Sequence, residues 1–175
     1  IILGRERQLS ARQLAGRETT VDEVLEEVLR DRVFYEESGG GVTFSGGEPL
    51  AQPDAFPFVT RLLDEGWEVV IETSGHVPLG PLDPRAVVIM DVKTPGSGES
   101  RRMEWANLDQ LRAADEVKFV IDGRADYEWA RDVVLGRNLA ERCTVLFSPV
   151  HGVLDPGTLG RWILDDGLGV RLQVQ

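Results

Sequence analysis

The hydrophobic positions of this chain fall into short apolar runs that alternate with helix-like repeats. Six runs are rich in β-branched and other apolar residues. They span residues 41–45, 68–73, 86–93, 116–121, 144–150 and 170–175. Short, nearly continuous apolar runs of this kind are typical of parallel strands that are covered on both faces. The pattern therefore predicts six strands.

Helices are predicted between these strands, where apolar residues recur at intervals of three and four. These segments are 54–65, 103–114, 125–136 and 156–166. Asp155 followed by Pro156 is a favourable helix start, and Gly66 and Gly167 are favourable stops. Strands that alternate with helices predict a parallel sheet with right-handed crossovers. We expect an α/β fold, a partial (β/α)6 barrel of the TIM-like type.

A further helix is predicted ahead of the first strand. Its apolar face comprises Val21, Val24, Leu25, Val28 and Leu29. Thr20 and Glu23 have the spacing of a capping box, and Gly39–Gly41 would end the helix. Residues 1–18 have no clear period, and we interpret them as a linker or as the remnant of an upstream region. Residues 19–175 are then one domain, a truncated barrel.

Composition excludes several classes of function. Acidic residues outnumber basic ones by 30 to 19, giving a net charge of −11, so nucleic acid is not an expected partner. No apolar run approaches the length that spans a membrane, and no membrane association is expected. The single cysteine, Cys143, cannot form a disulfide within the chain, which fits a cytoplasmic protein. Its expected role is that of a small buried side chain.

Polar or proline residues follow five of the apolar runs, in the stretches SGGEP, ETSG, DVK, VKFVI and FSPV. The carboxyl ends of parallel strands meet at one edge of a sheet, where α/β folds carry their ligand sites. We therefore expect these stretches to line one pocket.

The first of these strand ends has the strongest chemical signature. Gly46 and Gly47 leave main-chain groups open to close approach, and Glu48 adds a carboxylate. This combination favours a ligand with an ammonium group, where a charge-assisted hydrogen bond contributes about 1.5–3 kcal/mol. A tight turn with a first-turn glutamate is an equally weighted alternative. A phosphate loop is disfavoured, because no Lys-Ser or Lys-Thr follows the glycines.

Two lysines lie in apolar runs, where an unpaired ammonium group is unfavourable. Lys93 follows Asp91 by two residues, so both side chains face the same way, and a pocket role and an ion pair stay open. For Lys118 we expect a structural ion pair. His76 and His151 are expected to be solvated loop residues.

These motifs also carry a resemblance. SGGEP followed by ETSG one βα unit later resembles the radical S-adenosylmethionine superfamily. Residues 16–52, which include FYEESGGGVTFSGGEPL, resemble glycyl-radical-enzyme activating enzymes. From residue 72 onward, DVKTPGSGE, WANLDQL, DEVKFVIDGRADYEWARDVV and VLFSPVHGVLDP resemble the 7-carboxy-7-deazaguanine synthases of queuosine and 7-deazapurine biosynthesis.

The synthase resemblance implies a radical S-adenosylmethionine lyase that converts 6-carboxy-5,6,7,8-tetrahydropterin to 7-carboxy-7-deazaguanine. It implies S-adenosylmethionine, a 4Fe-4S cluster and Mg²⁺ as cofactors, a flavodoxin-like or ferredoxin-like electron donor, and a homodimer. The residues it assigns to cofactor binding are Gly46, Gly47, Glu48, Ser74, Asp91, Val92 and Lys93. Those it assigns to substrate binding are Ser45, Ser148 and Pro149.

The chain departs from the family at the cluster. The CxxxCxxC loop that follows the first barrel strand is absent from the sequence, and so is the neighbouring magnesium contact. We therefore expect a barrel without its first strand and cluster loop, inactive alone, with no catalytic residue or metal ligand of its own. Two alternatives stay open. One is a glycyl-radical-enzyme activating enzyme, similar to pyruvate formate-lyase activase, and the other is a noncatalytic relic that binds a small molecule or a partner.

Overall fold

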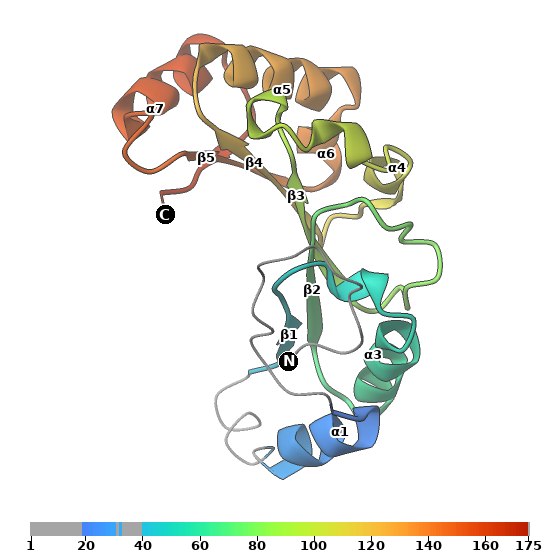
Figure 1. Ribbon diagram of the computed structural model, residues 1–175. Coiled ribbons are helices and arrows are strands. Elements are labelled where there is room, and N and C mark those ends of the chain that lie inside the picture. The colour runs from blue at the N-terminus through green and yellow to red at the C-terminus, as the bar shows by residue number, and fades with distance from the viewer. Residues whose placement is uncertain (1–18, 31, 33–39, 175) are drawn as a thin grey trace. The chain divides into compact units, whose positions relative to one another are not determined.

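The computed structural model describes residues 19–30, 32 and 40–174 (Figure 1). The proposed linker at 1–18 and the helix stop at Gly39 lie outside these residues. The chain forms two compact units. The first comprises the residues up to Ile71 together with Leu82–Ala86, and the second comprises Glu72–Pro81 and the residues from Val87 onward. The division of the chain into a linker and one domain stays a prediction.

Six strands form in the order in which they occur in the chain. They are β1 (Val42–Phe44), β2 (Val69–Thr73), β3 (Val87–Val92), β4 (Glu116–Ile121), β5 (Thr144–Pro149) and β6 (Arg171–Leu172). The pairs β1–β2, β3–β4, β4–β5 and β5–β6 are all parallel. The predicted parallel strands are thus confirmed, although β6 is much shorter than the apolar run that predicted it.

The helices follow the predicted alternation. They are α1 (Val21–Arg30), α3 (Ala55–Asp64), α4 (Asn107–Gln110), α5 (Arg124–Gly136), α6 (Leu139–Arg142) and α7 (Pro156–Asp165). Short 3-10 turns form at η1 (Pro49–Ala51), η2 (Pro95–Ser97) and η3 (Ser100–Arg102). The predicted helix over 103–114 is wrong, because only α4 forms there. Met103 and Leu111, which flank α4, have extended backbone and are buried outside any helix.

In the first unit, α1 begins with the predicted capping box. The Thr20 amide donates to Glu23 Oε2 at 2.9 Å, and the Glu23 amide donates to Thr20 Oγ1 at 3.2 Å. The helix buries Val24 and Leu25. The side chain of Phe58 on α3 packs edge-on against Phe44 of β1, with 5.5 Å between ring centres. The contact between Phe58 and Phe44 helps to hold the short strand β1, which the SGGEP turn follows.

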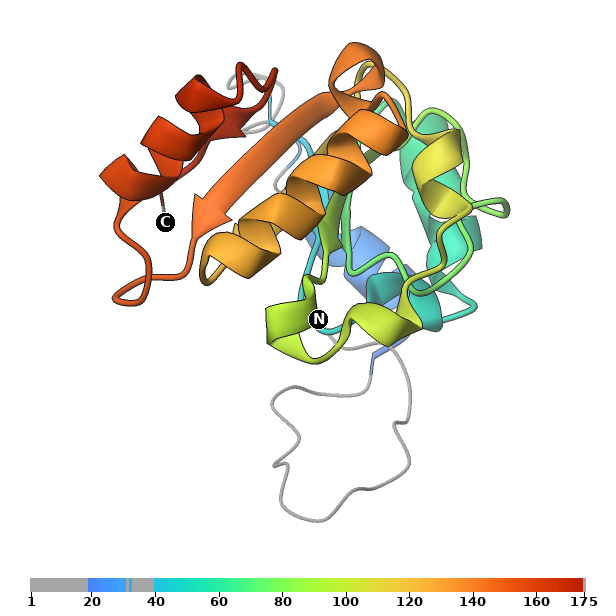
Figure 2. The same cartoon turned by 90° about the horizontal axis from the view of Figure 1, so that it is seen from above.

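In the second unit, α5 and α7 lie on the same side of β4 and β5 (Figures 1 and 2). Phe119 of β4 and Phe147 of β5 point to this side, where Phe119 packs on Trp129 and Phe147 packs on Tyr127. Burial alternates along β3 and β4, with every second residue buried and the others half-buried. The second face of β3 and β4 is therefore less completely buried than the first, whereas β5 is buried on both faces from Val145 to Pro149.

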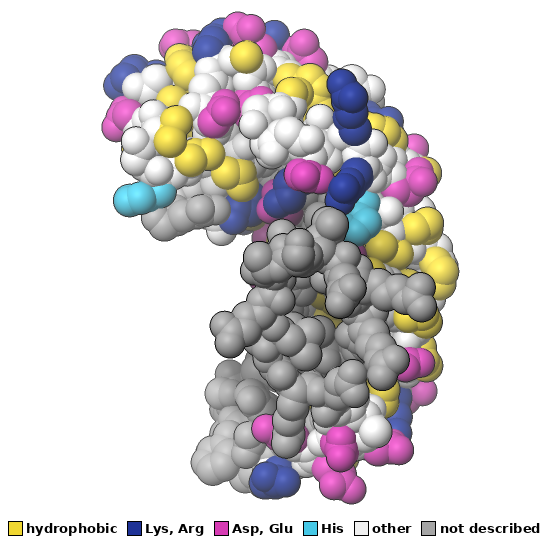
Figure 3. Space-filling view, in the orientation of Figure 1, with side chains coloured by type: hydrophobic (Ala, Val, Ile, Leu, Met, Phe, Trp, Pro, Cys, Tyr) yellow, Lys and Arg dark blue, Asp and Glu magenta, His cyan; other side chains and the backbone are white. Residues whose placement is uncertain are grey.

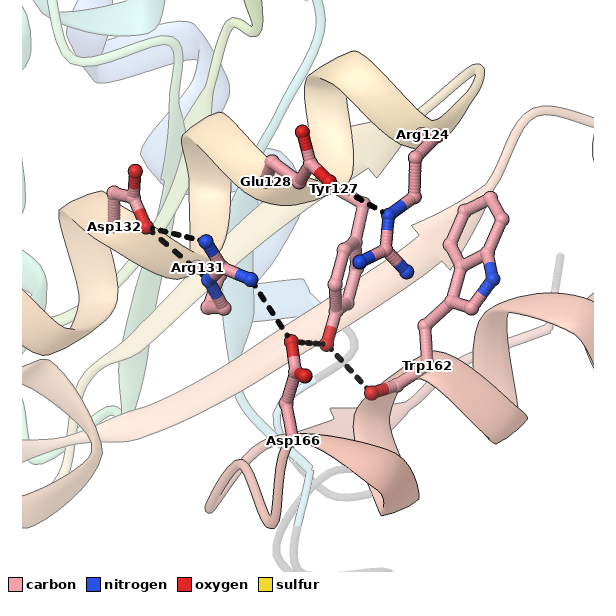
Figure 4. A network of polar contacts seen from close by, with 7 residues as sticks. All are labelled: Arg124, Tyr127, Glu128, Arg131, Asp132, Trp162 and Asp166. Carbon is pink, nitrogen blue, oxygen red and sulfur yellow. Dashed lines mark hydrogen bonds and ion pairs between the residues drawn. The ribbon is translucent and has the colours of Figure 1, made fainter.

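A polar network ties α7 to α5 (Figure 4). The Tyr127 hydroxyl lies 2.7 Å from the Trp162 carbonyl and 2.9 Å from Asp166 Oδ2, and Arg131 donates to the same carboxylate oxygen at 3.1 Å. The Tyr127 and Arg131 donors lower the pKa of Asp166. Burial, then the neighbouring carboxylate, raises the pKa of Tyr127 to about 12. The predicted start of α7 is confirmed, since Asp155 Oδ2 accepts from the Thr158 amide at 2.8 Å.

Candidate functional site

The SGGEP turn follows directly from β1 in the first unit. Gly46 and Gly47 have φ angles of +87° and +62°, in the region that favours glycine. A Cβ placed on either residue would meet no atom within 4 Å, and both residues are exposed. The main chain at this turn is therefore open to a ligand, as the sequence predicted. Ser45, the predicted substrate contact, lies beside it and is exposed.

Glu48 has a structural role at this turn. Its side chain caps η1, where Oε1 accepts from the Leu50 amide at 3.2 Å, and Leu50 is buried. In the protein without a ligand, Glu48 is therefore the first-turn glutamate of a tight turn, which is the alternative interpretation of this motif. It does not exclude a ligand, because a carboxylate has about four acceptor positions. The fit to an ammonium group rests on open main chain beside a carboxylate.

In the second unit, the ETSG strand end is fixed by a buried asparagine. Asn107 is fully buried and donates from Nδ2 to the carbonyls of Gly75 (3.0 Å) and Val77 (2.8 Å). Its Oδ1 accepts from the Leu79 amide at 2.9 Å. Ser74 therefore lies on a loop whose main chain is fixed by the single side chain of Asn107. The serine hydroxyl lies 2.5 Å from Nδ1 of His76, whose exposure agrees with the expected solvated loop position.

Gly75 is required in this loop for two reasons. Its φ angle is +74°, and a Cβ would come within 2.9 Å of Met103 and 3.0 Å of Met90. Sequence reasoning did not identify Asn107 or Gly75 as site residues. WANLDQL was seen as a family motif, but nothing in it shows that the asparagine reaches a loop 28 to 32 residues away.

The end of β3 places Asp91 and Lys93 on one face, as predicted. Lys93 Nζ lies 2.6 Å from Asp91 Oδ2, so the ion-pair alternative is present. Asp91 Oδ1 is buried and has no hydrogen-bond partner among the residues that the structure describes. An unsatisfied buried acceptor favours a hydroxyl or amino donor from a ligand. Val92 is fully buried, so only its main chain is available for the predicted cofactor contact.

The substrate candidates on β5 are covered. Ser148 and Pro149 are both buried, and the Ser148 hydroxyl donates to Oε1 of Gln173 at 3.2 Å. Gln173 lies just beyond β6, so the side chain of Ser148 is engaged within the protein. Its assignment to substrate stays a prediction.

A pair of carboxylates lies after β4, at a position that sequence reasoning did not single out. Asp126 is buried, and its Oδ1 accepts from the Gly96 amide at 2.9 Å. Its Oδ2 has no partner among the described residues. Desolvation, then the neighbouring Asp126 carboxylate, raises the pKa of Asp122. Gly96 is needed here because a Cβ would meet both carboxylates within 2.6 Å.

The residues present do not fit an iron–sulfur cluster. The sequence contains one cysteine, and the structure places Cys143 in the interior, with its thiol 3.6 Å from the Leu139 carbonyl. Burial raises the pKa of this thiol, which disfavours the thiolate that binds iron. Within the described part of the chain, no three His, Cys, Asp or Glu side chains gather as a metal site. The expected packing role of Cys143 is confirmed.

Comparisons with solved structures define the class of fold. The structure of QueE from Escherichia coli matches with a TM-score of 0.66 and 19% identity, covering 90% of this chain and 64% of that one. Streptococcus suis SuiB, solved bound to S-adenosylmethionine, matches with a TM-score of 0.60 and 11% identity, covering 93% of this chain and 45% of that one. The α/β fold of this chain is thus shared with these two proteins.

Sequence comparison gives the family. The 7-carboxy-7-deazaguanine synthase of Koribacter versatilis is 41% identical over 174 residues, which covers 91% of this chain and 75% of that protein. The chain belongs to the 7-carboxy-7-deazaguanine synthase family. The activating-enzyme resemblance is real but limited to segments. Pyruvate formate-lyase 2-activating enzyme of Escherichia coli is 38% identical over 101 residues, covering 55% of this chain. No family model matches the chain.

Two further findings concern membrane spans and surface charge. No helix in the described ranges is long and apolar enough to cross a membrane. Acidic and basic side chains are interspersed over the helices of the second unit (Figure 3).

Proposed function

We propose that this chain supplies S-adenosylmethionine- and pterin-binding elements of a 7-carboxy-7-deazaguanine synthase, which converts 6-carboxy-5,6,7,8-tetrahydropterin to 7-carboxy-7-deazaguanine. The observation that carries the proposal is the 41% identity to the Koribacter synthase over 91% of the chain. The open turn at Gly46 and Gly47 supports it, because an amino-acid-bearing cofactor needs uncovered main chain. The bound cofactor supplies the hydrogen-abstracting chemistry.

The proposed roles of the chain's own residues are binding and orientation. The carbonyls of the Gly46–Gly47 turn and the Glu48 carboxylate hold the methionine ammonium group of the cofactor. Asp91 and the main chain of Val92 and Lys93 contact its nucleoside part, since Asp91 has an unsatisfied acceptor. Ser74 supports this pocket from the loop that Asn107 fixes. Ser45, Ser148 and Pro149 remain candidates for the pterin.

Cofactor cleavage is not assigned to these 175 residues. A radical S-adenosylmethionine cluster needs three thiolates, and the sequence holds one cysteine. No step through the cluster or through Mg²⁺ is derived. We further propose a cytoplasmic setting, which the single buried thiol supports, with a flavodoxin-like or ferredoxin-like electron donor and a homodimeric assembly.

The binding role is tested by calorimetry with S-adenosylmethionine. Glu48→Gln keeps an oxygen that can accept from the Leu50 amide but removes the charge, so it separates the ligand role from the cap. We expect about tenfold weaker binding, since a charge-assisted hydrogen bond contributes about 1.5–3 kcal/mol. Glu65→Gln, on the exposed end of α3, is the charge-matched control and should bind normally. Equal affinity of Glu48→Gln and the unmodified chain would refute the ammonium assignment.

The division between binding and cleavage is tested anaerobically. After incubation with iron, sulfide and a reductant, this chain should release no 5′-deoxyadenosine from S-adenosylmethionine, with or without carboxy-tetrahydropterin. The Koribacter synthase, treated in the same way, is the positive control. Production of the nucleoside by this chain would show that it carries a cluster site that its residues do not reveal.

A further inference from the structure

A cavity opens at the amino-terminal ends of β5 and β6 in the second unit, at the opposite edge of the sheet from the FSPV strand end. Its volume is about 280 Å³, and its wall includes Arg142, Cys143, Thr144, Gly169 and Arg171. The proposed function places its ligands at the carboxyl edge of the sheet, and β5 runs for six residues, about 20 Å, between the two edges. Any ligand of this cavity is therefore a different one.

Arg171 lines the cavity from the edge strand of the sheet. It pairs in register with Leu146 of β5, so its side chain is on the same face as Leu146 and as Thr144, two residues earlier. Its guanidinium forms no hydrogen bond or ion pair with any residue in the described ranges. Lys118, in the same register row, also lacks an acidic partner among these residues, so the ion pair expected for it is wrong. Two cations on this face thus lack an internal counter-charge.

Arg142 brings a second guanidinium to the cavity wall, and main-chain carbonyls hold it in place. Its Nη2 donates to the carbonyls of Leu108 (3.1 Å), Asp109 (2.9 Å) and Leu111 (3.3 Å). A guanidinium has five N–H donors, and Nη2 carries two of them. The three N–H groups on Nε and Nη1 have no acceptor within the described part of the chain. Arg142 is therefore a positioned, half-buried cation with unused donors.

The acids near the cavity do not neutralise these two arginines. Glu141, also on the wall, is exposed and bonds to none of the described residues. Asp115, whose main-chain carbonyl accepts from the Thr144 amide, is already paired with Arg112 at 3.0 Å. The wall thus carries two guanidinium groups against one carboxylate, in a chain whose net charge is −11. This local excess of positive charge favours an anion.

The rest of the wall indicates what kind of anion fits. Guanidinium groups bind phosphate and carboxylate oxygens through paired N–H donors. The Thr144 hydroxyl has no partner among the described residues and is a further donor. The small residues Ala113, Ala140 and Gly169 also line the cavity and leave it open. Its volume lies just below the range of about 300–1,000 Å³ that is typical of drug-sized ligands, so the ligand is small.

We propose that this cavity binds a small oxyanion, a phosphate or carboxylate group, through Arg142 and Arg171. Arg142 supplies positioned donors, Arg171 supplies a second guanidinium from the edge strand, and Thr144 donates its hydroxyl. Binding is reversible ion pairing, and no proton or bond is transferred. Both guanidinium groups are partly solvated, so the dissociation constant should be about 1 mM and should rise with salt concentration.

The test follows amide signals of the ¹⁵N-labelled chain while sodium phosphate or sodium acetate replaces sodium chloride at constant ionic strength. We expect saturable shifts of the Cys143, Thr144 and Gly169 signals with at least one of the two ions. A tighter response to phosphate would identify a phosphate ligand, and a tighter response to acetate would identify a carboxylate ligand.

Arg171→Gln is the deciding variant, because its side chain makes no contact that folding would lose. It should bind about tenfold more weakly, the loss that removal of one charge-assisted hydrogen bond gives. Arg171→Lys keeps the charge without the paired donors and should bind with intermediate affinity. Arg161→Gln, on the exposed side of α7, is the charge-matched control and should bind as the unmodified chain does.

Two results would overturn the proposed anion site. One is the absence of saturable shifts at these three amides with both ions, and the other is equal affinity of Arg171→Gln and the unmodified chain. Both results would leave the proposed binding of S-adenosylmethionine and pterin intact, because those ligands are assigned to other residues.

Discussion

The Asn107→Ala substitution probes how the ETSG strand end is held. The side chain makes three hydrogen bonds, to the carbonyls of Gly75 and Val77 and from the amide of Leu79. The Gly75 carbonyl also accepts from the Glu104 amide and stays satisfied in the variant. The variant therefore leaves two main-chain groups without a partner.

The magnitude follows from these groups. An unsatisfied buried polar group costs about 1–3 kcal/mol, and the third hydrogen bond contributes about 0.5–1.5 kcal/mol. These contributions sum to about 2.5–7.5 kcal/mol. Because the bond to the Val77 carbonyl is only part-buried, we expect a loss of about 3–5 kcal/mol in the free energy of unfolding, measured by urea denaturation. Local opening should also be visible as faster hydrogen exchange at the Leu79 amide.

Gln110→Ala is the matched control, because Gln110 ends the same short helix, is exposed and should change stability by less than about 0.5 kcal/mol. A loss of less than 1 kcal/mol in Asn107→Ala, with normal exchange at Leu79, would refute the reasoning. It would mean that the loop carrying Ser74 is held by other contacts.

Three further predictions concern single side chains. Gly75→Ala should lower the free energy of unfolding by about 2–4 kcal/mol in urea denaturation, because the new Cβ would meet Met103 at 2.9 Å. Gly98→Ala is the control, since Gly98 has a similar φ angle but open space around it, and it should cost about 1 kcal/mol. Equal losses in the two variants would contradict the steric explanation. Tyr127→Phe should lose about 1–2 kcal/mol, because it removes the one hydroxyl proton that the Trp162 carbonyl and the Asp166 carboxylate share, and wild-type stability would argue against a role for that network. The raised pKa of Asp122 means that the native state binds this proton more tightly, so its stability contribution should be lost as pH rises from about 4 through the folded pKa. Asp122→Asn should remove that part of the pH dependence in denaturation series, and superimposable pH profiles would rule out the coupling to Asp126.

Local signals in the sequence predicted most of the fold. The capping box at Thr20 and the Asp155-Pro156 start are contacts within a few residues, so spacing alone identifies them. Apolar runs likewise located the strands, because strand burial depends on residue type. The helix over 103–114 failed because Leu108 and Leu111 satisfy the same spacing whether they pack from a helix or from an irregular loop.

The site was only partly predictable for the same reason. The open main chain at Gly46 and Gly47 follows from residue type, and the structure agrees. The hold of Asn107 on the ETSG loop depends on which distant residues become neighbours, and so does the lack of an acidic partner for Lys118 among the described residues. Lys118 was expected to have an acid partner on general grounds, but register gives it Asp91, which Lys93 already occupies.

The most direct test of the account follows main-chain resonances of the ¹⁵N-labelled chain as S-adenosylmethionine is added. The central claim is that the turn after β1 is an open receptor for the amino-acid end of the cofactor. We predict saturable shifts of the Gly46, Gly47 and Glu48 amide signals that are weaker in Glu48→Gln. Signals at this turn that stay unmoved while other regions respond, or that respond equally in the variant, would contradict it.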